Sequence, residues 1–243
     1  MRGWIGERGG RRLRRALGVT RLVLAALAIA ALVANFRYVL GFRSFAAENF
    51  FSYFTVQSAF FAIGVLIVSG IRALTGAEQR VWLHALRAAV TSYTLVSGIV
   101  FGIIAAQAST RDYRVDVPWS DVLLHFVVPA ALLVDWAIES WLLPHTRPIP
   151  RRAVLAAVPF PVVWLVFTLM RGAEVGWYPY FFLDPYEVGG WPGILVYCTL
   201  VLAILLAVTW MLVQLNRVGT RRGAAARVSG ADAAAPAPAG VTP

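Results

Sequence analysis

Charged side chains are scarce in this chain: only 14% of its 243 residues are charged, whereas 59% are hydrophobic. An average soluble domain is about a quarter charged, and much of the surface of any globule must face water. A soluble protein of this size has no place for so many apolar residues, so the composition excludes a soluble globular domain. It also excludes a nucleic-acid-binding role for the net charge of +10, because a chain this apolar belongs in a membrane.

Lysine is absent and cysteine occurs once, as Cys198, so all 22 basic residues are arginine. A single cysteine excludes an internal disulfide framework and any metal site built from several thiolates. The use of arginine alone, together with abundant alanine, glycine and proline, is typical of a GC-rich bacterial genome. We therefore expect a multi-pass protein of the bacterial plasma (inner) membrane.

Long apolar runs are the main positive feature of the sequence, and a helix that crosses a bilayer needs about 20 such residues. Six runs qualify, at residues 19–40, 50–71, 88–106, 119–143, 153–170 and 193–213. We predict an all-α polytopic membrane protein whose residues 19–215 form a bundle of six transmembrane helices. Residues 1–18 are expected to form a basic arm on anionic lipid headgroups, and residues 216–243 a disordered tail.

The arginines are distributed unevenly between the two sides that these six spans define. If the N-terminus is cytoplasmic, the outer side holds only Arg37, Arg43, Arg111, Arg114 and Arg171, and the other 17 arginines are on the cytoplasmic side. The positive-inside rule then predicts that both termini are cytoplasmic. We also expect this arginine-rich side to contact anionic lipids.

Recognised motifs for cofactors, metals and nucleophilic serine are missing. The chain has no glycine-rich phosphate loop, no HExxH pattern, no GxSxG elbow and no internal repeat of the kind found in transporters with inverted halves. Of the three histidines, His84 and His145 flank predicted cytoplasmic loops far from His125, which argues against a three-histidine metal site. We therefore expect neither a metal ion nor an organic cofactor.

Four ionisable residues lie in the fourth span, where such groups are costly and are candidates for function. At about 100° per residue, Asp121, His125, Asp135 and Glu139 fall within an arc of about 80°, so they share one face of the helix. Asp121 and Glu139 are expected to reach the two interfaces. His125 lies six residues in from Trp119, about 9 Å deep, so it is a candidate for chemistry as well as for a structural hydrogen bond.

A stripe of hydroxyl groups follows the second span, at Ser52, Thr55 and Ser58. Such a stripe often serves helix packing alone. Thr55, however, lies five residues in from Phe50, about 7.5 Å below the same outer face from which His125 is reached. If the second and fourth spans are neighbours, a hydroxyl and an imidazole meet at matching depth, which is the minimum nucleophile and base pair.

The outer loop before the sixth span is rich in aromatic residues, with the sequence RGAEVGWYPYFFLDP at residues 171–185. An interfacial aromatic belt accounts for its Trp and Tyr residues. It accounts less well for Asp184, which stands between aromatic residues and Pro185. We interpret this stiff loop as a candidate lid or lateral gate over a cavity. Cys198, at similar depth in the sixth span, is expected to be a packing residue.

Three segments resemble a known family: FFSYFTVQS at 50–58, LLHFVVPAALLVDW at 123–136, and the loop 171–185. Over residues 20–215 the chain resembles the bacterial Pr6Pr family of six-span membrane proteins, departing from its pattern at Ala59 and Phe181. It is more distantly similar to the eukaryotic androgen-induced membrane proteins, which cleave fatty acid esters of hydroxy fatty acids with a threonine and a histidine. This resemblance implies Thr55 as the nucleophile and His125 as its partner.

Two hypotheses follow for the function. In the first, the protein is an intramembrane hydrolase of lipid esters, with Thr55 and His125 as catalytic residues and Asp121, Asp135 or Asp184 in supporting roles. In the second, it binds or transports lipid without catalysis, and the polar face of the fourth span forms a track for protons or cations that requires Asp135. A scaffold whose polar residues only stabilise the bundle is a third interpretation.

Overall fold

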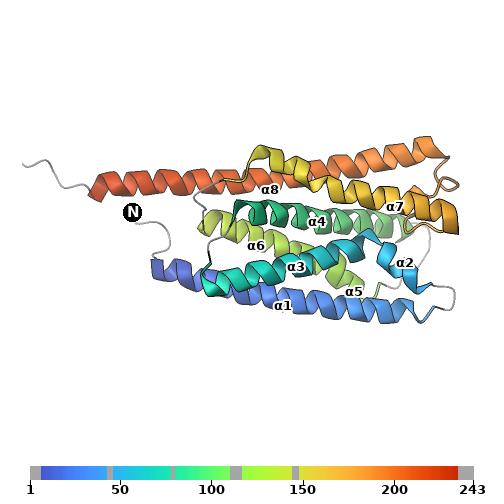
Figure 1. The fold of residues 1–243 in the computed structure, drawn as a ribbon, viewed down its shortest axis with the longest axis horizontal. Coiled ribbons are helices and arrows are strands. Elements are labelled where there is room, and N and C mark those ends of the chain that lie inside the picture. The colour runs from blue at the N-terminus through green and yellow to red at the C-terminus, as the bar shows by residue number, and fades with distance from the viewer. Residues whose placement is uncertain (1–6, 43–45, 78–79, 110–116, 144–147, 235–243) are drawn as a thin grey trace, which may run out of the picture.

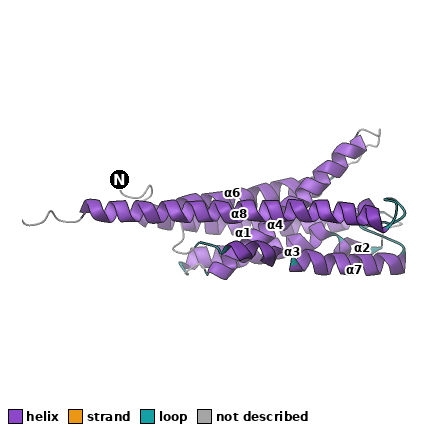
Figure 2. Cartoon of the chain, turned by 90° about the horizontal axis from the view of Figure 1, so that it is seen from above, coloured by secondary structure: helices purple, strands orange, loops and turns teal. Residues whose placement is uncertain are grey.

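The computed structural model describes residues 7–42, 46–77, 80–109, 117–143 and 148–234. Within these ranges every regular element is helical, and six helices are long and apolar enough to cross a membrane (Figures 1 and 2). The all-α polytopic class is therefore confirmed. The first helix begins and the last described helix ends at the same end of the bundle (Figure 1). Several predictions concern residues outside the described ranges, namely those for 1–6, Arg43, Arg111, Arg114, His145, Arg147 and 235–243.

The first span is helix α1, Glu7–Val39, which packs against helix α3, Phe54–Thr75. Small residues allow this close approach: Ala25, Ala28 and Ala31 of α1 are buried in the core. The described part of the basic arm, from Glu7 onward, continues the same helix into the bundle rather than forming a separate segment.

The second span is broken, where the sequence predicted one helix over residues 50–71. Helix α2, Ala47–Ser52, ends before Tyr53, whose backbone is extended (φ −69°, ψ 133°), and α3 begins at the next residue. The break is stabilised from elsewhere in the chain, because the carbonyl of Ser52 accepts a hydrogen bond of 3.0 Å from the indole Nε1 of Trp164. A new helix N-terminus is thereby created at the start of the span.

The third span is helix α4, Val81–Ser109, and the fourth consists of three consecutive helical segments, of which the middle one is π-helical. Helix α5, Trp119–Val122, continues as the π-helical turn η1, Leu123–Val127, and then as helix α6, Val128–Leu142. In the π-helical turn the amide of Val128 bonds to the carbonyl of Leu123, five residues back. Such turns are rare and occur frequently at functional sites.

The fifth span begins as a 3₁₀ helix, η2, Arg151–Ala157, and continues as helix α7, Pro159–Val175. The change of helix type occurs where the sequence places Pro159, which has no amide hydrogen to continue the ladder. The outer loop contains the short 3₁₀ helix η3, Phe181–Leu183. The loop between α7 and α8 lies at one end of the bundle (Figure 1).

The sixth span is helix α8, Trp191–Ala234, which is much longer than the predicted span 193–213. Residues 216–234 are helical in the structure, where the sequence predicted a disordered tail. The stretch RRGAAAR at 221–227 is rich in alanine and arginine, two strong helix formers, and it extends a helix that has already formed. Asn216 is buried and its side-chain oxygen accepts from the amide of Ile149, which fixes α8 against the segment before η2.

Candidate functional site

Thr55 and His125 meet inside the bundle. Thr55 lies in the first turn of α3 and His125 in the π-helical turn η1, and both side chains are buried. The Oγ1 atom of Thr55 is 3.1 Å from Nε2 of His125, within hydrogen-bonding distance. The two side chains that sequence depth selected therefore contact each other directly.

The ring of His125 is held on its other nitrogen and on one face. Its Nδ1 lies 3.0 Å from the backbone carbonyl oxygen of Asp121, which can only accept a hydrogen bond. The proton is thus assigned to Nδ1, and Nε2 is left as the acceptor for the hydroxyl of Thr55. Phe101 stacks on the imidazole with ring centroids 3.9 Å apart and planes at 17°.

A glycine on α4 allows the backbone around His125 to come close. Pro129 has no amide hydrogen, so it cannot donate to the carbonyl of His125 one turn earlier. That carbonyl lies against Gly98, where a Cβ atom would overlap its oxygen. The absence of a side chain at Gly98 therefore sets how closely α4 and the fourth span approach at the level of the Thr55–His125 pair.

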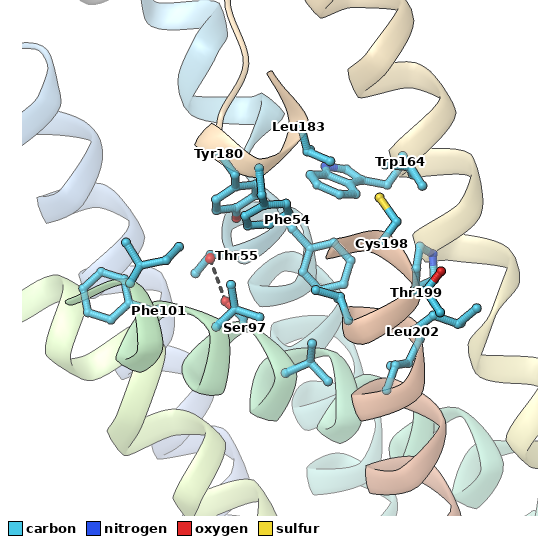
Figure 3. Close-up of a pocket in the computed structure, with 18 of the residues that line it drawn as sticks. Phe54, Thr55, Ser97, Phe101, Trp164, Tyr180, Leu183, Cys198, Thr199 and Leu202 are labelled. Carbon is cyan, nitrogen blue, oxygen red and sulfur yellow. Dashed lines mark hydrogen bonds between the residues drawn. The ribbon is translucent and has the colours of Figure 1, made fainter. Parts of the chain in front are cut away.

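Two further hydroxyl groups converge on Thr55. The Oγ atom of Ser97, on α4, is 2.6 Å from Oγ1 of Thr55 (Figure 3). The hydroxyl of Tyr180, in the outer loop, lies on the side of its ring that faces Thr55 (Figure 3), close enough for Thr55 and Phe54 to influence its pKa. Burial raises the pKa of Tyr180 to about 12, so this phenol stays protonated at neutral pH. The sequence indicated neither contact, because no motif singled out Ser97 and an interfacial aromatic belt accounted for the Tyr residues of the loop.

The predicted supporting carboxylates take different positions. Asp121 orients His125 through its backbone carbonyl, while its carboxylate is 4.0 Å from the imidazole Nδ1 and accepts a 2.6 Å hydrogen bond from the side chain of Asn35. Asp184 accepts a hydrogen bond of 2.9 Å from the amide of Tyr186 two residues later, which stabilises the turn after η3. Asp121 therefore belongs to the site, whereas Asp184 shapes the loop.

Asp135 and Glu139 form a separate network with two buried arginines. Arg21 of α1 and Arg87 of α4 are only 1% and 4% exposed. Asp135 is 2.9 Å from Nε of Arg21 and 2.5 Å from a guanidinium nitrogen of Arg87, and Glu139 also pairs with both arginines. We refer to these four residues as the charge tetrad.

The charge tetrad changes two expectations from the sequence. Arg21 and Arg87, which were counted as cytoplasmic charge, lie within the bundle, and Glu139 is buried rather than interfacial. The physical reason is mutual compensation, since two cations and two anions together carry no net charge. Asp135 has its hydrogen-bonding partners in this tetrad, ten residues along the fourth span from His125, which is about 15 Å at helical rise.

A cavity of about 240 Å³ adjoins the Thr55–His125 pair. Thr55, Ser97 and His125 form its polar end. Its remaining wall is largely apolar and comes from α3, α4, α7, α8 and η3 (Figure 3). Its rim includes Val162 of α7 and Leu195 of α8, which are exposed on the outside of the bundle, Leu195 by 64%. The cavity therefore opens sideways between α7 and α8, toward the surface that lipid covers.

The groups that the described residues offer for chemistry at this site are their own side chains. Within the described ranges, no group of three or more His, Cys, Asp or Glu residues is arranged to hold a metal ion. Comparison of the chain with protein-family models, with curated proteins and with solved structures found no match. What the site offers is a hydroxyl group bonded to the basic nitrogen of an oriented imidazole, at the wall of an apolar cavity.

Proposed function

We propose that this protein is an integral membrane hydrolase of lipid esters, with Thr55 as the nucleophile and His125 as the general base. The observation that carries this proposal is the 3.1 Å contact between Oγ1 of Thr55 and Nε2 of His125 at the polar end of the cavity. A hydroxyl group is a weak nucleophile near neutral pH unless an adjacent base removes its proton. His125 is in the tautomer that this role requires, because its Nδ1 proton is committed to the Asp121 carbonyl.

The proposed reaction has two halves. Thr55 Oγ1 attacks the ester carbonyl while its proton moves to His125 Nε2, and the tetrahedral intermediate then expels the alcohol, which takes that proton. A water molecule next gives a proton to Nε2 and attacks the acyl group on Thr55. Collapse releases the carboxylic acid and returns the proton to Thr55, so the net reaction is hydrolysis of one ester by one water.

The shape of the cavity supports a lipid as the substrate. Its lateral opening between α7 and α8 admits a hydrocarbon chain directly from the bilayer, and its wall carries no Asp, Glu or Arg side chain among the described residues. An ester placed at Thr55 would therefore be uncharged and flanked by hydrocarbon. The alternative function is lipid binding without catalysis, which the cavity would support even without the contact between Thr55 and His125.

A proton or cation track along the fourth span has less support. Such a track requires its ionisable groups to be linked to one another across the membrane. Asp121 and His125 interact with Asn35 and Thr55, whereas Asp135 pairs with arginines of the charge tetrad. The polar residues are thus divided into two networks, and only the first adjoins the cavity.

The orientation of the protein is also part of the proposal. We place both termini in the cytoplasm of a bacterium and the Thr55–His125 pair toward the outer leaflet of its plasma membrane. The excess of arginine on one side supports this orientation even without the two buried arginines of the tetrad. The four arginines Arg8, Arg11, Arg12 and Arg15 recur at helical spacing in α1, and they suit anionic headgroups at that face.

Covalent labelling with a long-chain fluorophosphonate tests the proposal. An activated Thr55 hydroxyl should displace fluoride and become labelled in native membranes, and Thr55→Ala and His125→Ala should each abolish labelling and hydrolysis of long-chain esters. Thr75→Ala is the matched control, because Thr75 is an exposed residue at the other end of α3. Labelling or hydrolysis by the Thr55→Ala protein at the wild-type rate would refute the assignment.

A further inference from the structure

The break at Tyr53 leaves backbone donors beside the nucleophile. The first hydrogen bond within α3 runs from the amide of Gln57 to the carbonyl of Tyr53, at 3.2 Å. The amides of Phe54, Thr55 and Val56 therefore have no acceptor within their own helix. Positive charge from the helix dipole is concentrated at this end, next to the atom that would attack the substrate.

Tyr180 is the side chain that reaches these donors. Its ring lies among those of Tyr53, Trp164 and Phe182, at centroid distances of 5.8, 6.0 and 5.2 Å. Its hydroxyl group lies near the amides of Phe54 and Thr55 and near the Thr55 side chain, all of which influence its pKa. Figure 3 shows this hydroxyl on the side of the ring that faces Thr55, and Tyr180 lines the cavity.

The hydrogen bonds at Thr55 leave the phenol proton available to a substrate. A hydroxyl group has one donor and two acceptor positions. The proton of Thr55 goes to Nε2 of His125, and Ser97 is free to donate to Oγ1. The phenol of Tyr180 lies close by, so the carbonyl oxygen of an ester placed at Thr55 would be within reach of its proton.

We propose that Tyr180 is a catalytic residue that donates a hydrogen bond to the carbonyl oxygen of the substrate as negative charge develops on it. This inference deepens the proposed hydrolase and rests on it. The positive end of the α3 dipole lies beside the phenol and makes it a stronger donor. Donors fixed in advance in a water-poor site are the usual means of stabilising such an oxyanion.

Replacing the phenol by a phenyl ring removes the hydroxyl group and keeps the ring. Tyr180→Phe keeps the ring contacts with Tyr53 and Trp164, so the loop should retain its position. With p-nitrophenyl decanoate as the probe, kcat should fall by about 10²- to 10³-fold, as for the loss of one oxyanion donor, while KM stays within a factor of about three. Tyr186→Phe is the control, because Tyr186 is in the same loop and is 95% exposed.

A pair of ligands separates a catalytic role from a structural one. A long-chain alkyl trifluoromethyl ketone adds Thr55 Oγ1 to its carbonyl carbon, the proton passing to His125, and so places an oxyanion at the site without a leaving group. The ether of the same chain length fills the cavity but forms no adduct. Tyr180→Phe should weaken binding of the ketone by the same factor as kcat and leave binding of the ether unchanged.

Each outcome decides between the proposals. Equal weakening of ketone and ether, or a change in KM alone, would overturn the role of Tyr180 as an oxyanion donor and leave it a structural residue. Wild-type kcat in Tyr180→Phe, with Thr55→Ala inactive, would also overturn it and leave the hydrolase proposal intact. A wild-type protein that neither hydrolyses the ester nor forms the ketone adduct would overturn both.

Discussion

Adding one methyl group at Gly98 should disable the Thr55–His125 pair without touching either residue. The new Cβ of Gly98→Ala would overlap the carbonyl oxygen of His125, a backbone atom that no rotamer change can move. Carbon–oxygen contacts of this kind lie near 3.3–3.6 Å, so α4 and η1 must separate by roughly 1 Å. A misplacement of about that size costs about 100-fold in rate, and the strain should lower stability by about 1–3 kcal/mol.

The matched control lies one turn later on the same helix. A Cβ at Gly102 would meet only the ring of Phe126, at 3.7 Å, which is an ordinary contact. Gly102→Ala should therefore label with the fluorophosphonate within about twofold of the wild-type rate, because alanine also suits the helix better than glycine does. Labelling rates and ester hydrolysis would be measured at equal protein abundance, and thermal unfolding in detergent would give the stability of each variant.

Two results would refute this reasoning. Wild-type labelling and stability in Gly98→Ala would mean that the contact between Gly98 and the His125 carbonyl does not set the spacing of the two helices. Equal losses in Gly98→Ala and Gly102→Ala would mean that α4 tolerates no added side chain in this region, so that the damage is not specific to His125.

Three further predictions concern other parts of the molecule. Asp135→Asn should lower the free energy of unfolding in detergent by about 3–5 kcal/mol, because it leaves the charge tetrad with an unpaired cation. The added change Arg87→Gln should recover part of this loss. An Asp135→Asn protein as stable as the wild type would contradict the prediction. Because the pKa of Tyr180 is about 12, the phenol keeps its proton, and the rate of ester hydrolysis should not decline between pH 8 and about 10. A decline in rate centred near the ordinary tyrosine pKa of about 10 would argue against the role of this phenol. Cys198 lines the cavity, so N-decylmaleimide should alkylate its thiol and block ester hydrolysis. The Cys198→Ala protein should stay active in the presence of the reagent. Inhibition of that variant as well would mean that the reagent acts at another residue.

The estimate of membrane depth correctly placed Thr55 and His125 at the same level, because it depends only on the helical rise per residue and on where each span begins. That calculation tolerates local irregularity, and the π-helical turn at His125 did not disturb it. The two residues lie on spans that happen to pack together, and nothing in the sequence of either span contains that information.

The features that the sequence did not predict depend on partners far away along the chain. Tyr53 interrupts an apolar segment with no proline or glycine, and the stabilising donor is Trp164, 112 residues away from Ser52. Likewise, the positive-inside rule counts arginines by their position relative to the spans, so it could not recognise that Arg21 and Arg87 face carboxylates. The spacing of Asp135 and Glu139 by one helical turn was the available signal for such a network.

The charge tetrad also constrains the order in which the protein can be assembled during synthesis. Arg21 and Arg87 belong to the first and third spans, whereas both of their carboxylate partners lie in the fourth. A nascent chain carries both arginines without these carboxylates until residue 135 leaves the ribosome, and a buried charge that lacks its partner is strongly destabilising. We therefore expect the first three spans to reach their final packing only when the fourth arrives.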